Sequence, residues 1–263
     1  MKTFRINLNK ENEKLKKVKY LKIVPIADVH KGDKLLDYTE LNKTVKYIKD
    51  NPDVYTILNG DLMNTAIKSS VSDCYEDTMT PMEQIESLVK LLEPIKHKIL
   101  VATTGNHERR IKRESSIDIM QIVMAQLGLS NRYTSGAYYL FLYFGEKEQG
   151  RKAPMVYTIY GYHGSGGGRK AGGKLNKVIE MAEKYFADVY LMSHVHVKMG
   201  TKQNYFIPDF GNKALVEKEM AFVISNSYLF HGGYGEDNGY NIATRTRIEI
   251  ELNGKYREKK III

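Results

Sequence analysis

Apolar side chains recur along the chain with two periods, one typical of strands and one typical of helices. Residues 3–9 alternate between apolar and polar side chains, as a half-buried strand does. Residues 19–27 are more continuously apolar, which indicates a central strand of a sheet. Two further apolar runs, at residues 54–58 and 99–103, also predict strands.

Between and after these strands, apolar residues recur at helical spacing and predict three helices. The first helix is expected after Thr39, whose hydroxyl can cap it. The second begins with a capping box at residues 80–83 that includes a proline in the first turn. A third helix is predicted from Ser115 or Ser116 through Gln126.

The second half of the chain has a different pattern. A helix is predicted over residues 174–186, and most other segments are apolar strands. These strands are expected at residues 138–144, 155–160, 189–192, 220–224 and 246–252. Two mixed sheets packed face to face with helices outside would accommodate both halves. With 263 residues and 42% apolar content, we expect one domain spanning residues 1–263.

Composition narrows the class of protein. The single cysteine, Cys74, excludes an internal disulfide and fits a reducing compartment. No apolar run approaches the length of a membrane span, and the basic start of the chain lacks the apolar stretch of a signal peptide. We therefore expect a cytoplasmic protein without a membrane partner. The net charge of +9 favours a polyanionic partner such as nucleic acid, or else a lysine-rich surface that serves solubility alone.

Five short polar segments stand out, each directly after a predicted strand. They are Asp28-Val29-His30, residues 60–64, residues 105–108, His163-Gly164 and His194-Val195-His196. Ligand sites in such sheets form beyond the carboxyl ends of strands, so we expect these segments to meet. They contain five of the seven histidines, which argues against a chance arrangement. Asp-x-His and His-x-His each require a turn that aims both side chains to one side.

The ligand types indicate a metal site. Imidazole, carboxylate and amide groups together favour manganese, iron or zinc over calcium or magnesium. The lack of a cysteine cluster argues against a structural zinc site. We expect two divalent metal ions, with manganese first and iron or zinc as alternatives.

The order of the five segments resembles the calcineurin-like metallophosphoesterase superfamily, and Gly105-Asn106-His107-Glu108 is its most specific part. The resemblance spans Asp28 to His196, about two-thirds of the chain. It implies an α/β fold, a four-layer α/β/β/α sandwich of two mixed sheets flanked by helices. The sequence departs from the family pattern at Ser193, where family members usually carry glycine.

The resemblance also assigns roles. Asp61 is expected to bridge two metals. One metal is expected to bind Asp28, His30 and His196, and the other Asn106, His163 and His194. His107 is expected to stay free of metal and to donate a proton to the leaving group. Asn64, where related protein phosphatases carry aspartate, is expected to orient His107.

The implied mechanism uses both metals. Two divalent ions roughly 3.5–4 Å apart share a water, lower its pKa and produce a bridging hydroxide as the nucleophile. They also neutralise the phosphate oxygens. Arg109 is the expected phosphate contact next to His107, and Arg169, Lys170 and Lys174 are expected to contact a polyanion from the Gly-rich loop beside His163.

Three functions remain open from the sequence. The first is a phosphodiesterase or nuclease acting on nucleic acid, which the basic charge favours. The second is a phosphomonoesterase or a nucleotide or protein phosphatase, although residues 64–66 depart from the motif of protein phosphatases in this family. The third is a non-catalytic nucleic-acid-binding or scaffold protein, which would usually have lost metal ligands.

Overall fold

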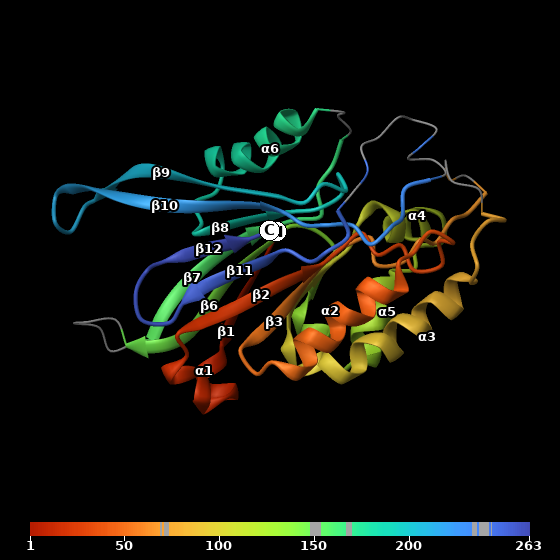
Figure 1. Cartoon of the computed structure of the whole chain (residues 1–263), viewed down its shortest axis with the longest axis horizontal. Coiled ribbons are helices and arrows are strands. Elements are labelled where there is room, and N and C mark those ends of the chain that lie inside the picture. Colours follow the sequence, from red (N-terminus) through yellow and green to blue (C-terminus); the bar gives the residue numbers. More distant parts are fainter. Residues whose placement is uncertain are drawn as a thin grey trace.

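The structure is a computed structural model that describes residues 1–68, 70, 74–147, 154–166, 170–232, 236, 242 and 244–263. Within these residues, twelve strands form two six-stranded sheets (Figure 1). The first sheet has, in spatial order, the strands β1 (Lys2–Asn7), β6 (Tyr138–Lys147), β7 (Pro154–Gly161), β8 (Val189–Met192), β10 (Ala214–Ile224) and β9 (Met199–Asp209). The second has β12 (Lys259–Ile262), β11 (Glu249–Asn253), β2 (Tyr20–Ile26), β3 (Val54–Asn59), β4 (Ile99–Thr103) and β5 (Tyr133–Thr134).

Both sheets are mixed, as the sequence predicted. In the second sheet β2, β3, β4 and β5 run parallel, and β11 joins antiparallel to both β2 and β12. In the first sheet β7, β8 and β10 run parallel, whereas β6 and β9 are antiparallel to their neighbours β7 and β10. The parallel strands of each sheet direct their carboxyl ends to one edge, where ligand sites form.

Alternation along the strands divides the apolar side chains between two layers. Leu21 and Ile23 of β2 belong to the core between the sheets, whereas Val24 and Ile26 face the helices. Val189 and Leu191 of β8 likewise face the other sheet, and the following side chains lie on the outer face. Each central strand is therefore buried on both faces, which explains its continuous apolar pattern.

Helices cover both outer faces. The helices α2 (Tyr38–Asp50), α3 (Pro81–Leu92) and α5 (Ile119–Gln126) pack on the second sheet, and α6 (Ala171–Ile179) packs on the first (Figure 1). Shorter elements connect the layers: α1 (Leu8–Glu11), α4 (Asn106–Ser115), η1 (Glu13–Lys17), η2 (Glu93–Lys98), η3 (Ser130–Arg132) and η4 (Glu180–Glu183). The predicted α/β/β/α sandwich is confirmed.

Several predicted boundaries were wrong for local reasons. Strand pairing of β1 ends at Asn7, and Leu8 is buried at the start of α1. Asp37 caps α2 in place of Thr39, because its carboxylate accepts the N–H of Glu40 at 3.0 Å. The capping box at Thr80 is confirmed.

The largest errors concern three other segments. Residues 106–115 form α4, and Asp118 caps α5, so neither Ser115 nor Ser116 opens a helix. Ser116 instead ends α4 in a left-handed conformation. The helix predicted over 174–186 begins at Ala171 and changes to a 3₁₀ turn after Ile179.

The hairpin of β9 and β10 extends beyond the body of the sandwich (Figure 1). The strand β9 was missed, because its distal half alternates exposed polar and apolar side chains without a buried face. Phe206, Phe210 and Leu215 are exposed on this hairpin. Among the described residues, no helix has the length and apolar character needed to cross a membrane.

Candidate metal centre

The five polar segments meet at one edge of the sandwich. Asp28, Asp61 and Asn106 follow the parallel strands β2, β3 and β4 of one sheet. His163 and His194 follow the parallel strands β7 and β8 of the other. Because the two sheets pack face to face, the loops from both sheets converge, and the predicted convergence is confirmed.

The backbone at this edge adopts a conformation that L-residues rarely take. The φ angles of Asp28, His30, Asp61, His194 and His196 are +49°, +50°, +50°, +73° and +52°. A left-handed residue without glycine costs about 1–2 kcal/mol. These turns direct both side chains of Asp-x-His and of His-x-His to the same side, as predicted. Such strain clusters at functional sites, where surrounding contacts hold it.

One cluster of ligand atoms contains Asp28, His30 and His196. Nε2 of His196 lies 3.3 Å from Oδ1 of Asp28 and 3.2 Å from Nε2 of His30. Asp28 is fully buried, and its Oδ1 has no hydrogen-bond partner among the described residues. A buried carboxylate oxygen without a donor and beside two imidazole nitrogens has the surroundings of a metal ligand.

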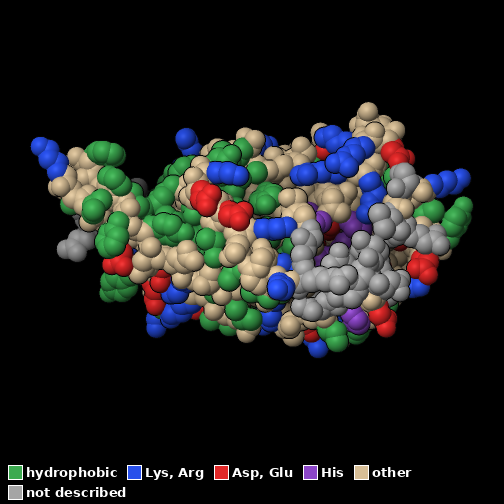
Figure 2. Space-filling view, turned by 90° about the horizontal axis from the view of Figure 1, so that it is seen from above, with side chains coloured by type: hydrophobic (Ala, Val, Ile, Leu, Met, Phe, Trp, Pro, Cys, Tyr) green, Lys and Arg blue, Asp and Glu red, His purple; other side chains and the backbone are tan. Residues whose placement is uncertain are grey.

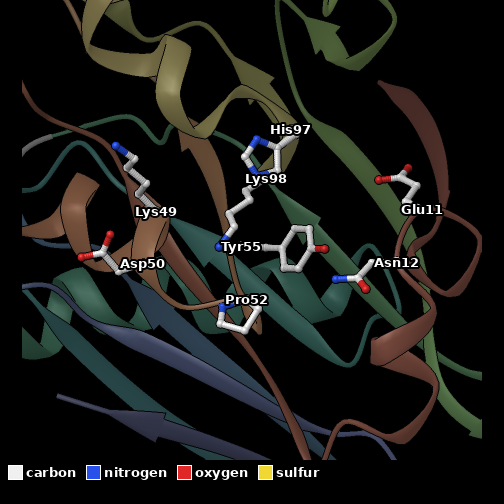
Figure 3. A pocket seen from close by; sticks show the side chains of 8 residues that line it. All are labelled: Glu11, Asn12, Lys49, Asp50, Pro52, Tyr55, His97 and Lys98. Atoms are coloured by element: carbon white, nitrogen blue, oxygen red, sulfur yellow. The ribbon is translucent and has the colours of Figure 1, made fainter.

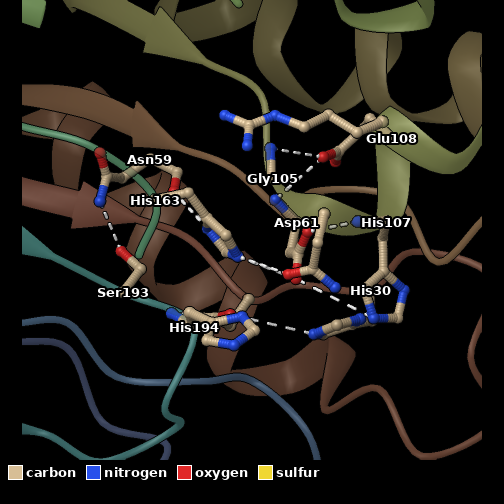
Figure 4. Close-up of polar contacts among 12 residues, drawn as sticks. His30, Asn59, Asp61, Gly105, His107, Glu108, His163, Ser193 and His194 are labelled. Carbon is tan, nitrogen blue, oxygen red and sulfur yellow. Dashed lines mark hydrogen bonds and ion pairs between the residues drawn. The ribbon is translucent and has the colours of Figure 1, made fainter. Parts of the chain in front are cut away.

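The other cluster contains Asp61, His163 and His194, with Asn106 beside them. Nε2 of His163 lies 3.0 Å from Oδ2 of Asp61 and 3.2 Å from Oδ1 of Asn106. Nδ1–H of His163 donates to the carbonyl of Asn59 at 2.8 Å (Figure 4). This bond fixes the tautomer so that Nε2 presents its lone pair to the cluster.

Asp61 belongs to the ligand groups on both sides. It groups with His163 and His194, and also with His30 and His107. Although burial lowers it, the charge of Asp61 raises the pKa of His163 to about 10. The carboxylates therefore favour positive charge at this position, and the donor set fits a divalent first-row metal.

Two glycines of the motifs allow this close approach. A Cβ on Gly105 would lie 2.0 Å from Oδ1 of Asp61. A Cβ on Gly60, where φ is +86°, would lie 2.6 Å from the nitrogen of Gly105 and 2.7 Å from Nδ1 of His163. The loops after β3 and β4 can therefore touch only because both positions lack a side chain.

Glu108 holds these two loops together, a role that the sequence did not reveal. Its buried carboxylate accepts the N–H groups of Asp61 and Gly105 at 3.1 and 2.9 Å (Figure 4). It also accepts those of Leu62 and Met63 at 2.6 and 3.0 Å. Burial and the nearby charge of Asp61 raise the pKa of Glu108 to about 7. The signal for this role was available, since Glu108 is the third residue of α4 and can reach back to Gly105.

Lys174 and Ser193 support the His-x-His turn. The ammonium of Lys174 is buried and donates to the carbonyl of Val195 at 3.1 Å. The prediction that Lys174 contacts a polyanion is therefore wrong. The hydroxyl of Ser193 accepts from Nδ2 of Asn59 at 2.6 Å and from the hydroxyl of Ser225 at 2.8 Å. Serine thus fits where the family usually has glycine, and it links the two sheets (Figure 4).

His107 lies beside Asp61 and His30 at the start of α4. Its Nε2 is 3.9 Å from Oδ2 of Asp61, and its ring meets the ring of His30 edge-on with centroids 4.3 Å apart. Nδ1–H donates to the main-chain carbonyl of Asn64 at 2.9 Å. The side chain of Asn64 turns away and donates to Oδ1 of Asp77 at 2.5 Å. Asn64 was expected to orient His107, and it contacts His107 through its main-chain carbonyl. Its side-chain amide binds Asp77 instead.

Of the three predicted substrate contacts, the structure describes Arg109 and Lys170. Arg109 donates to the carbonyls of Thr104 and Ser135 at 3.4 and 3.1 Å. Lys170 is exposed before α6, and Arg169 lies outside the described residues. A neighbouring arginine, Arg110, acts on His107 through its charge. Burial lowers the pKa of His107, the charge of Asp61 raises it, and the charge of Arg110 lowers it.

Among the described ligand residues, exposure differs from one side of the centre to the other. Asp28, Asp61 and His163 are buried, whereas Asn106 is exposed and His196 is 34% exposed. Figure 2 shows histidine side chains in a hollow of the surface, with lysine and arginine side chains along its rim. A ligand would therefore approach from the side of Asn106 and His196.

A separate cavity of about 420 Å³ lies at the other ends of the strands (Figure 3). It adjoins the amino ends of β3 and β4 and contains none of the predicted site residues. Its lining residues are Glu11, Asn12, Lys49, Asp50, Pro52, Tyr55, His97 and Lys98.

Comparison with known proteins agrees with this geometry. A family model described as calcineurin-like phosphoesterase matches residues 21–198. A predicted phosphoesterase from Streptococcus pneumoniae is 14% identical, with 93% of this chain and 90% of that chain covered and a TM-score of 0.38. GAP50, described as the anchor in the inner membrane complex of Plasmodium, is 12% identical, with 93% and 85% covered and a TM-score of 0.49. No curated protein matches the sequence.

Proposed function

Because this chain belongs to the calcineurin-like phosphoesterase family, we propose that it uses two metals to hydrolyse phosphodiester bonds in nucleic acid. The observation that carries the two-metal assignment is the position of Asp61, whose carboxylate lies with His163 and His194 on one side and close to His30, a member of the other ligand group, on the other. A single-metal centre would need one such group, whereas here two groups lie side by side.

The residues divide between the two ions. Asp28, His30 and His196 would hold one ion, and Asn106, His163 and His194 the other, with Asp61 between them. When bound, manganese ions supply Lewis-acid chemistry: they stabilise negative charge on the phosphate and lower the pKa of water. The orienting hydrogen bond of His163 to the carbonyl of Asn59 would leave its Nε2 available to such an ion.

His107 is the proposed proton donor. Its Nδ1–H is occupied by the carbonyl of Asn64, so a proton transferred to the leaving oxygen must be carried at Nε2. This nitrogen faces the ligand cluster from the side of Asp61. A positioned proton donor contributes roughly 10²–10⁴-fold to rate.

Charge supports a nucleic-acid substrate. The net charge is +9, Arg109 follows His107 by two positions in α4, and Lys170 is exposed directly before α6, with Arg169 next to it in sequence. A polynucleotide offers several phosphates to such a surface, whereas a small monoester offers one. We assign Arg109, Arg169 and Lys170 to contacts with the phosphates that flank the cleaved bond.

A substrate panel with manganese tests this proposal. We expect turnover of bis-p-nitrophenyl phosphate and of single- or double-stranded DNA, slower turnover of p-nitrophenyl phosphate, and no turnover after chelation. Asp61→Asn is the negative control within the same fold. Faster monoester than diester hydrolysis without DNA binding would assign the site to a phosphomonoesterase or nucleotide phosphatase. Metal binding without any hydrolysis would indicate a binding protein.

A further inference from the structure

The imidazole of His107 is held from the segment that follows Asp61. Nδ1–H of His107 donates to the carbonyl of Asn64 at 2.9 Å, and the hydroxyl of Thr65 donates to the carbonyl of His107 at 2.8 Å. A carbonyl can only accept, so the first bond requires the proton on Nδ1 and leaves Nε2 directed towards Asp61. The position of the Asn64 carbonyl thus decides both the tautomer and the orientation of the ring.

This segment does not hold its shape by itself. Thr65 has a φ of +45°, a left-handed conformation that is unfavourable for a β-branched residue. Such a conformation persists only where surrounding groups hold it. Thr65 is fully buried, so its N–H also needs a partner inside the protein.

Two side chains outside the metal centre supply these partners. Asp77 accepts from Nδ2 of Asn64 at 2.5 Å and from the N–H of Ala66 at 3.1 Å. Gln84 accepts the N–H of Thr65 at 2.9 Å. Three consecutive residues, 64 to 66, are therefore each bonded to Asp77 or Gln84.

Asp77 and Gln84 are themselves joined. Nε2 of Gln84 donates to Oδ2 of Asp77 at 3.0 Å and to the carbonyl of Met79 at 2.9 Å. Gln84 is fully buried in α3, and it packs so closely on Gly32 that a Cβ there would lie 2.4 Å from its Nε2. The pair thus connects the His107 support to a helix of the core, independently of Glu108, which holds Asp61.

We propose that Asp77 and Gln84 are positioning residues that present the Asn64 carbonyl to His107 and so keep its Nε2 directed at the leaving group. Neither residue belongs to the ligand clusters, so both act through Asn64 and Thr65. The inference rests on the proposed function, because it takes His107 as the proton donor. It assigns a positioning role to a hydrogen-bonded network of Asn64, Thr65 and Gln84, which are buried, and Asp77, which is half-buried.

The test compares Asp77→Ala with Glu76→Ala, a matched control on the same loop. Glu76 is exposed and pairs with Lys34 at 2.6 Å, away from Asn64. The substrates are aryl methyl phosphates whose phenols range from acidic to weakly acidic, with manganese. We expect Asp77→Ala to slow poor leaving groups by about tenfold or more, good ones little, and to leave metal content unchanged. Glu76→Ala should behave as the wild type.

A reciprocal exchange keeps the test valid if Asp77→Ala folds poorly. The double variant Asn64→Asp with Asp77→Asn reverses the hydrogen bond between the two side chains. The new amide oxygen can still accept from Ala66 and Gln84. We expect Asn64→Asp alone, which opposes two carboxylates, to be impaired, and the double variant to recover most turnover of poor leaving groups.

A second readout does not depend on activity. Imidazole ¹H–¹⁵N spectra of the zinc-loaded protein, with His107 assigned from His107→Asn, report the tautomer. Nδ1 should be protonated in the wild type and in Glu76→Ala, and lose its fixed protonation in Asp77→Ala. An unchanged tautomer, equal slowing of all leaving groups, or loss of metal in Asp77→Ala would overturn the inference. If the wild type hydrolyses no phosphoester, the proposed function fails, and the spectra still decide whether Asp77 positions His107.

Discussion

Charged side chains and histidines lie at both ends of the sandwich, but their surroundings differ. Around the cavity at the amino ends of β3 and β4, several charged side chains have local partners. Lys98 donates to the carbonyls of Ile48 and Asn51, and Arg132 pairs with Glu11 at 2.8 Å. At the carboxyl ends, Asp28 and Asp61 are buried among histidines, and Oδ1 of Asp28 has no donor among the described residues.

The backbone conformation also differs between the two ends. Five of the ligand residues at the carboxyl ends are left-handed, whereas no residue lining the cavity of about 420 Å³ has a positive φ. Cavity volume therefore does not locate the chemistry of this protein. Buried carboxylates gathered among histidines and held by strained turns locate it, because such an arrangement costs stability unless a bound cation compensates it.

The largest difference in turnover should appear when one residue is substituted at the carboxyl ends and, in a separate variant, one at the amino ends. Asp61→Asn removes the charge shared by the two ligand groups, and we expect turnover to fall by at least about 10³-fold, with weakened binding of both metals. His97→Asn in the cavity should leave turnover and metal content unchanged. Equal sensitivity of the two ends, measured as kcat and metal content, would refute the distinction.

The next effect separates proton donation from metal binding. His107→Asn should lower turnover by roughly 10²–10⁴-fold while both metals remain bound. The reason is that His107 bonds to Asn64 through Nδ1 and lies 3.9 Å from Asp61, outside the two predicted sets of ligands. Metal analysis beside kcat is the measurement, and loss of a metal would make His107 a ligand.

The sequence predicted most of the fold and of the ligand clusters, for a physical reason. Strand periodicity and the polar residues at strand ends are local properties, so the segments at Asp28, Asp61 and His194 could be placed at one edge. The resemblance then supplied the grouping of ligands around Asp61. In the structure, ligand atoms of Asp28, His30 and His196 lie within 4.8 Å of one another, as do those of Asp61, His163 and His194.

The supports could not be predicted, since they depend on contacts between distant segments. Lys174 looked like an exposed basic residue of a Gly-rich loop, but it is buried against Val195. Asp77 and Gln84 lie in an unremarkable stretch of sequence and reach Asn64 only after folding. Arg109 was the expected phosphate contact, but the arginine whose charge lowers the pKa of His107 in the folded chain is Arg110.

A smaller effect should follow from removing a support of the centre. Lys174→Met keeps the apolar stem and removes the donor to the carbonyl of Val195. Because Val195 lies between two ligands, we expect metal affinity to fall by about 10–100-fold. Lys177→Met, one turn further along α6, is the control. Competition with a fluorescent chelator gives both affinities, and equal values for the two variants would contradict the assignment.

The smallest effect concerns the basic residues Arg169 and Lys170 and the salt dependence of DNA binding. DNA affinity should fall linearly with salt on logarithmic axes, with a slope of about −2 to −3. Replacing Arg169 and Lys170 with alanine should reduce the slope by about 1–2 and leave hydrolysis of a small diester unchanged. The matched control replaces Lys49 and Lys213, which are exposed elsewhere. A slope that changes equally in both double variants would indicate nonspecific attraction by net charge.

The central claim is that two metals share Asp61 at the carboxyl ends of the strands. Anomalous diffraction at the manganese edge, from crystals grown with manganese, tests it most directly. The account predicts two peaks on either side of the Asp61 carboxylate, one beside Asp28, His30 and His196 and the other beside Asn106, His163 and His194. A single peak, or a peak bonded to His107, would contradict it.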